Sequence, residues 1–98
     1  MVSKGERSRL KITDDTRKLV RNAHPDLKRR IRVALQTILD DPSTGKVLVD
    51  DLVGLRSFRV GRTRIIYRLA SKQIIEVVTI GPRKTVYEET FKLINRKP

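Results

Sequence analysis

The sequence contains no cysteine and no tryptophan, a single histidine, and only 4% aromatic residues. Without cysteine it can form neither disulfides nor thiolate zinc sites. The one histidine, His24, excludes multi-histidine metal sites and the two-histidine ribonuclease mechanism. Because Pro25 follows it directly, His24 is interpreted as the residue at which a helix starts. The composition therefore predicts neither a metal nor another cofactor.

Long hydrophobic runs are also missing. No apolar stretch approaches the ~20 residues needed to cross a membrane, so no membrane partner is expected. The first ten residues lack the apolar centre of a signal peptide. These absences predict a cytoplasmic protein. The 98 residues suffice for one domain, and their periodic apolar pattern favours a folded chain over a disordered one.

Positive charge is abundant. Lysine and arginine number 23 against 11 acidic residues, which gives a net charge of +12. Residues 1–53 carry 12 basic and 8 acidic side chains, whereas residues 54–98 carry 11 and 3. This excess indicates a polyanionic partner, and the C-terminal half is the better candidate to face it. The alternative is that the charge serves only solubility.

Two helices are predicted in the N-terminal half, after a possible first strand within residues 4–12. Thr13 is expected to cap a short helix that ends near Asn22, and Pro25 to start the next helix. The second helix has apolar residues at three- and four-residue spacing, namely Leu27, Ile31, Leu35 and Ile38. Asp41 and Pro42 close it. The pair forms a helical hairpin.

Strand patterns fill the C-terminal half. Residues 55–60, 63–70 and 74–80 are predicted strands, joined by turns at Gly61-Arg62 and at residues 71–73. Residues 86–95 are predicted as a last short helix, or as a final strand that becomes a helix. The expected fold is α+β: a helical hairpin packed on a mainly antiparallel sheet of about four strands, with the other sheet face left available.

Alternation along the strands places arginines together. Arg59 and Arg64 are expected on the same face, opposite each other across the hairpin turn. Arg83 can join them if its strand lies next to the second hairpin strand. Three guanidiniums around one concavity suit a phosphate, because the planar fork of arginine matches two phosphate oxygens. The alternative is that these are edge arginines that only suppress aggregation.

Two segments resemble a known toxin family. LRSFRVGRTRIIY at residues 55–67 is similar to the central hairpin of the RelE/ParE toxin superfamily, in which an Arg-Val-Gly turn leads into an Arg-aliphatic-aliphatic-Tyr strand. GPRKTVY at residues 81–87 is similar to the closing segment of that family. The resemblance covers roughly residues 10–93. It is specific for the superfamily and weaker for its RelE branch.

The resemblance implies a function. RelE-branch proteins are toxins of type II toxin–antitoxin systems that share the microbial-ribonuclease fold and cleave mRNA in the ribosomal A site. By that resemblance the catalytic residues would be Arg64, Arg83 and Tyr87. The expected RNA-binding residues are Arg59, Lys84, Arg62 and Arg68. The best-known pattern has lysines where this chain has Ser57 and Arg59, so the resemblance leaves the general base unidentified.

The available side chains also constrain the mechanism. Arginine stabilises charge but does not give up its proton, and tyrosine has a reference pKa of about 10. Metal-independent cleavage of RNA would therefore depend mainly on positioning and electrostatic stabilisation. An enzyme with so few acid–base groups is expected to need a scaffold that orients its substrate. The ribosome, with its 16S rRNA, is the expected scaffold.

Other functions remain open at this stage. The alternatives are a ParE-type inhibitor of DNA gyrase without nuclease activity and a basic nucleic-acid-binding module without toxicity. The near absence of aromatic stacking residues disfavours the module. Either toxin implies a cognate antitoxin, whose acidic segment would wrap the basic surface and assemble the toxin into an oligomer.

Several residues have structural interpretations. Glu76 is expected to pair with an arginine across the sheet, and Glu88 and Glu89 to lie in the first turn of the last helix. Phe91, Leu93 and Ile94 are expected in the core, or in part on a surface that receives an antitoxin helix. The basic residues of the second helix either face solvent or contact ribosomal RNA; they are Lys28, Arg29, Arg30 and Arg32.

Overall fold

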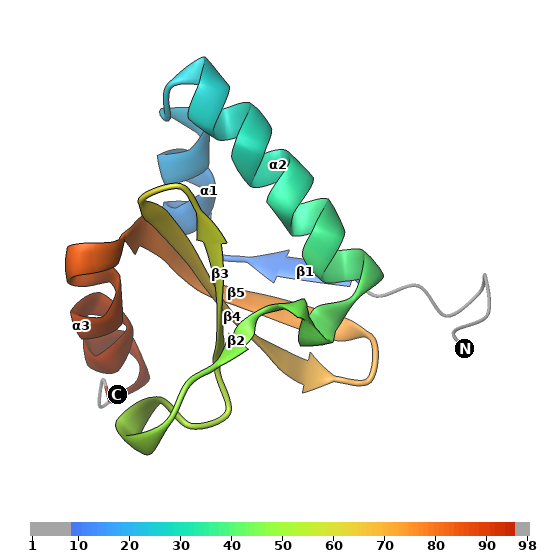
Figure 1. Ribbon diagram of the computed structural model, residues 1–98, viewed down its shortest axis with the longest axis vertical. Helices are drawn as coiled ribbons and strands as arrows, with labels where there is room; N and C mark the ends of the chain where they lie inside the picture. The colour runs from blue at the N-terminus through green and yellow to red at the C-terminus, as the bar shows by residue number, and fades with distance from the viewer. Residues whose placement is uncertain (1–8, 96–98) are drawn as a thin grey trace.

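The computed structural model describes residues 9–95, which form a five-stranded sheet with helices on both faces (Figure 1). The strands are β1 (Arg9–Ile12), β2 (Lys46–Val47), β3 (Arg56–Val60), β4 (Thr63–Ser71) and β5 (Ile74–Pro82). The helices are α1 (Asp14–Arg21), α2 (Pro25–Asp40) and α3 (Arg83–Ile94), with 3-10 turns η2 (Pro42–Thr44) and η3 (Asp50–Leu52). The predicted α+β class is confirmed.

The sheet has the strand order β1-β5-β4-β3-β2. Strands β2 to β5 form an antiparallel meander, while β1 pairs with β5 in parallel. The prediction of about four strands was therefore one short. The missed strand is β2, whose two residues are too few to show the alternation of apolar and polar side chains that predicts a strand. The part of the predicted first strand before Arg9 lies outside the described residues.

Local capping explains where the two N-terminal helices begin. The Thr13 hydroxyl accepts a hydrogen bond from the Thr16 amide at 3.2 Å, as an N-cap residue does. His24 caps α2 because its Nδ1 accepts a bond from the Asp26 amide at 3.2 Å, and Pro25 occupies the first turn. His24 is thus a helix-start residue, as the sequence predicts.

Alternate residues of the strands supply two apolar layers. Phe58, Val60, Ile65 and Tyr67 pack with the buried face of α2, in the larger core. Ile66 lies on the opposite face with Leu55 and with Val86 of α3. The expected alternation along both hairpin strands is confirmed. The second face is not wholly available, however, since α3 covers part of it (Figure 1).

The end of α3 differs from the prediction. Phe91, Leu93 and Ile94 are 43%, 43% and 38% exposed, so the expectation that they belong to the core was wrong. The helix buries Val86 and Thr90, which are four residues apart and share one narrow stripe. With only that stripe against the sheet, the last turn of α3 projects its apolar side chains outward.

Tyr67 ties the loop after α2 to the sheet. Its ring is fully buried, its hydroxyl donates to the Pro42 carbonyl at 2.7 Å, and it accepts from the Gly45 amide at 2.8 Å. A Cβ atom at Gly45 would lie 2.5 Å from this hydroxyl, so only glycine fits. The loop that leads into β2 is thereby fixed against β4.

Replacing Tyr67 with phenylalanine is expected to lower the free energy of unfolding by about 1–3 kcal/mol, because it leaves the buried Gly45 amide without a partner. Burial also raises the pKa of Tyr67 above its ordinary value of 10.0. The unfolded chain therefore loses this proton first, and stability should fall as the pH rises above about 10. Urea denaturation at pH 7 and at pH 10.5 measures how much the free energy of unfolding falls between the two pH values. This fall should be smaller for Tyr67→Phe than for the wild type, and equal falls would contradict the role given to Tyr67.

Candidate functional site

The site begins with two arginines that face each other across the hairpin. Arg59 of β3 and Arg64 of β4 are directly paired in register, on either side of the Gly61 turn. Gly61 has a φ of +61°, the left-handed conformation that the tight turn requires. Side chains paired in this way have Cβ atoms about 4.5–5.5 Å apart. The register confirms that the hairpin places the two residues opposite each other, while the Nε of Arg59 donates to the Gly61 carbonyl at 3.3 Å.

Arg64 is unusual among the described residues because its Nε atom is buried without a hydrogen-bond partner. A buried donor left without an acceptor costs about 1–3 kcal/mol, and more when the group is charged. No described carboxylate forms an ion pair with this guanidinium. Such a group favours an anion that supplies the missing acceptor, and a phosphate oxygen has the required chemistry.

Tyr87 approaches the arginines from α3. Its hydroxyl lies 3.2 Å from the hydroxyl of Ser57, which is buried on β3. Ser57 is two residues from Arg59, and therefore lies on the same sheet face about 7 Å along the strand. The phenol of Tyr87 thus contacts β3 two residues from Arg59, on the face that Arg64 shares. Tyr87 and Ser57 were each noted in the sequence, but no local pattern predicts the contact between them, because they lie 30 residues apart.

The other predicted residues lie around this centre. Arg64 is in register with Gly81, so the backbone of Arg83, at the start of α3, follows two residues later. The side chains of Arg83 and Lys84 lie outside the described part of the structure. Arg62 is an exposed residue of the hairpin turn. The backbone at Arg83 thus begins two residues after the partner of Arg64, and the predicted convergence of the three arginine side chains stays a prediction.

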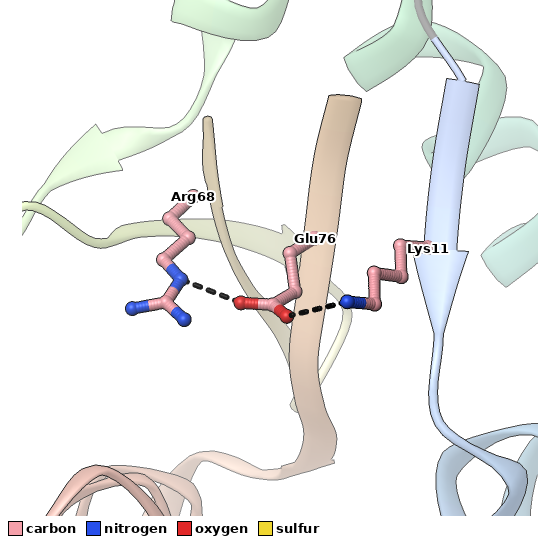
Figure 2. Close-up of polar contacts among 3 residues, drawn as sticks. All are labelled: Lys11, Arg68 and Glu76. Carbon is pink, nitrogen blue, oxygen red and sulfur yellow. Dashed lines mark hydrogen bonds and ion pairs between the residues drawn. The ribbon is translucent and has the colours of Figure 1, made fainter. Parts of the chain in front are cut away.

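Arg68 lies farther along β4 and is engaged by an acidic residue. Its Nε donates to Oε1 of Glu76 at 2.6 Å, which confirms the expected cross-sheet pairing of Glu76. Lys11 of β1 approaches the other oxygen of the same carboxylate at 4.0 Å (Figure 2). The strand pattern alone did not suggest Lys11, because its neighbour β5 is distant in sequence.

A groove opens on the other side of β3. It has a volume of about 370 Å³ and lies between α2 and the end of β3. Phe58, Val60 and Ala34 contribute to its apolar lining, and Arg29, Arg30 and Arg59 are its cationic members. The basic face of α2 therefore borders a concave surface. No local pattern predicts the groove, because it depends on how α2 packs on the sheet.

Within residues 9–95, no cluster of three histidine, cysteine or acidic side chains is suited to hold a metal ion. None of the helices described there is long and apolar enough to cross a membrane.

Solved structures with the same fold are toxins and toxin–antitoxin complexes. The toxin RelE of E. coli, in a doubly substituted mutant form in the free state, aligns with a TM-score of 0.72 and 17% identity, covering 90% of this chain and 98% of that one. The RelBE2 complex of Mycobacterium tuberculosis gives 0.67 and 21%, covering 79% and 99%. The RelE–RelB complex of Pyrococcus horikoshii OT3 gives 0.61 and 21%, covering 78% and 94%. At these identities the likeness establishes the fold.

Comparison of the sequence identifies the family, which the structural likeness alone does not. No curated protein matches the chain significantly. The profile of a family described as "ParE toxin of type II toxin-antitoxin system, parDE" matches residues 6–87, which is most of the chain. The structural relatives are RelE toxins and the matching profile is that of ParE, two branches of one superfamily. The chain therefore belongs to the RelE/ParE superfamily of type II toxin–antitoxin toxins.

Proposed function

We propose that this toxin is a ribosome-dependent endoribonuclease that cleaves mRNA in the A site and so inhibits translation. The observation that carries the proposal is the buried, unpartnered Nε of Arg64, which lies on the same sheet face as the Ser57–Tyr87 hydroxyl pair. Cations without acid partners beside a phenol suit a reaction at a phosphodiester. An inhibitor that acts only by binding a protein needs no such arrangement.

Each residue has a proposed role in this reaction. Arg64 would stabilise the negative charge that develops on the phosphate, supported by Arg59 and by Arg83. Tyr87, with its hydroxyl oriented by Ser57, would lie next to the 2′-hydroxyl and relay its proton as the 2′-oxygen bonds to the phosphorus. The bond from phosphorus to the 5′-oxygen of the next nucleotide breaks, and that 5′-oxygen takes up a proton as it leaves. Arg62, Arg68 and Lys84 would hold the RNA backbone. Metal plays no part in this scheme, because the guanidiniums supply the positive charge.

Dependence on the ribosome follows from what the site lacks. The site contains no histidine. The one histidine of the chain, His24, caps α2 and is not available as a general base. Positioning then has to supply much of the rate, and alignment of reacting groups is worth several kcal/mol. A message fixed in the A site offers that alignment, whereas free RNA does not.

A cognate antitoxin is the expected protein partner. Several of the structural relatives are described as complexes of RelE with RelB, and type II toxins are paired with antitoxin proteins. The excess of basic residues favours an acidic antitoxin segment, and the antitoxin would join the toxin into an oligomer. Co-expression with the neighbouring reading frame, followed by co-purification, tests this pairing.

The family profile favours a second candidate, a gyrase inhibitor of the ParE type without nuclease activity. Ser57 and Arg59, at positions where the RelE pattern has lysines, also fit this alternative. The two functions share one fold, so the fold does not choose between them.

The test uses purified protein in three parallel reactions: mRNA on programmed ribosomes, the same mRNA free in solution, and supercoiling of DNA by gyrase. We expect cleavage at one A-site position on the ribosome, little cleavage of free RNA, and unchanged supercoiling. Loss of supercoiling without message cleavage would establish the ParE alternative. Robust cleavage of free RNA would contradict the proposed need for a scaffold.

A further inference from the structure

A row of charged side chains crosses the sheet outside the candidate reactive centre (Figure 2). Lys11 of β1 and Arg68 of β4 are each in register with Glu76 of β5. Because neighbouring strands are about 4.8 Å apart, the backbones of the two basic residues are about 10 Å apart, with Glu76 midway. The Glu76 side chain is only 22% exposed, whereas those of Lys11 and Arg68 are 72% and 49% exposed.

Glu76 engages Arg68 in a way that leaves most of its guanidinium unused. The carboxylate accepts from Nε at 2.6 Å, and within residues 9–95 the two terminal amino groups of Arg68 form no hydrogen bond. A charge-assisted bond at Nε restricts the guanidinium plane. The terminal amino groups then remain able to donate to an oxyanion.

The surroundings suit a polyanion better than an amphipathic peptide. Ile75 and Val77, the neighbours of Glu76 on β5, are fully buried in the core on the other sheet face. Arg9, two residues before Lys11, is exposed and lies on the same face of β1. Two cations therefore contact one carboxylate and a third lies two residues along β1, so the local charge remains positive.

The row is also aligned with the candidate reactive centre. Arg64 and Arg68 lie on the same strand and on the same sheet face, four residues apart. Four residues of strand span about 13 Å, which corresponds to about four stacked nucleotides at ~3.4 Å each. Ile66 lies between them on this face and is buried under Leu55 and Val86, so an RNA strand bound at Arg64 would reach Arg68 by passing over this cluster.

We propose that Arg68 and Lys11 form a second phosphate-binding site for the RNA backbone, separate from the phosphate at Arg64, and that Glu76 is the positioning residue that holds the pair. This inference rests on the proposed function in one respect, that RNA is the ligand. Glu76 itself touches no RNA. Its contribution is to order the Arg68 side chain before binding, which reduces the conformational entropy lost on binding.

The test measures the affinity of the full chain for a single-stranded uridine 12-mer by fluorescence anisotropy at several NaCl concentrations. Loss of one phosphate contact should reduce the slope of log K against log salt by ~0.7, which corresponds to about fivefold weaker binding at 0.1 M salt. We expect this for Arg68→Gln. The matched control is Arg17→Gln, which removes the same charge from an exposed position on α1. A second arm replaces the 12-mer with vacant ribosomes.

The two arms distinguish the source of the phosphate. A change for the 12-mer assigns the site to the message, and a change confined to vacant ribosomes assigns it to ribosomal RNA. If Arg68→Gln and Arg17→Gln behave alike in both arms, the proposal is wrong. Binding is read without cleavage, and the measurement is repeated in the Tyr87→Phe background. Failure of the nuclease proposal therefore leaves this result interpretable.

The positioning role of Glu76 is tested by a double-mutant cycle. Removal of a negative charge alone should tighten RNA binding, so Glu76→Gln in the Arg68→Gln background should raise the affinity. In the wild-type background, Glu76→Gln also frees the Arg68 side chain, which should offset that gain. The affinity for RNA should then stay unchanged or fall. An equal gain in both backgrounds would show that Glu76 acts only as a charge and would overturn its positioning role.

Discussion

Substitution of Arg64 by leucine is expected to lower ribosome-dependent mRNA cleavage at least ~100-fold while leaving the protein folded. A 100-fold loss corresponds to about 2.7 kcal/mol of transition-state stabilisation, within the range measured for removal of one preorganised donor in an enzyme site. The buried Nε of Arg64 has no partner among the described residues, so the native fold gains no hydrogen bond from it. Its proposed partner is the phosphate.

The same substitution should therefore separate activity from stability. Leucine removes a buried donor without a partner, so the free energy of unfolding should stay the same or rise by about 1 kcal/mol. Arg64→Lys keeps the charge but loses the planar fork. Its cleavage rate should lie between those of the wild type and of Arg64→Leu. Arg17→Leu on the opposite side of the sheet is the control for the loss of one charge. A destabilised Arg64→Leu protein that still cleaves at the wild-type rate would contradict both parts of the prediction.

Removal of the Tyr87 hydroxyl is expected to have the second largest effect. Tyr87→Phe keeps the ring on α3 but removes the oxygen that lies 3.2 Å from the Ser57 hydroxyl. A positioned proton-transfer group contributes typically 10²–10⁴-fold to the rate, so single-turnover cleavage on programmed ribosomes should fall by about 100-fold or more. Binding to the ribosome should change little, because no charge is lost.

Ser57→Ala is the matched comparison, since it removes the other half of the same hydroxyl pair. If Ser57 only orients Tyr87, its removal should cost about tenfold or less in the cleavage rate, and Tyr87→Phe should cause little further change in stability. Thermal unfolding of both variants checks that the fold is intact. Cleavage by Tyr87→Phe at the wild-type rate would exclude the phenol from the reaction.

Local patterns in the sequence were sufficient for much of the fold. The cap at Thr13, the proline that starts α2 and the Gly61 turn each act within a few residues, so their outcomes follow from short-range chemistry. The parallel pairing of β1 with β5 joins segments more than sixty residues apart, and no local signal marks it. The exposed end of α3 depends likewise on how the helix crosses the sheet.

The candidate site shows the same division. The Arg59–Arg64 pairing follows from hairpin geometry and period-two alternation, and both are visible in the sequence. The burial of the Arg64 Nε, the Ser57–Tyr87 contact and the Lys11–Glu76–Arg68 row each require packing between elements distant in the chain. Residue types could be named in advance, but the contacts between them could not.

The central claim is that Arg64 and Tyr87 act together on one phosphodiester whose own 2′-hydroxyl attacks it. The most direct measurement is single-turnover cleavage on ribosomes programmed with an mRNA that carries one 2′-deoxynucleotide at the cleavage position. The account predicts that this message stays intact while the unmodified message is cut at that position. Cleavage of both messages at the same rate, or of neither while DNA gyrase is inhibited, would contradict it.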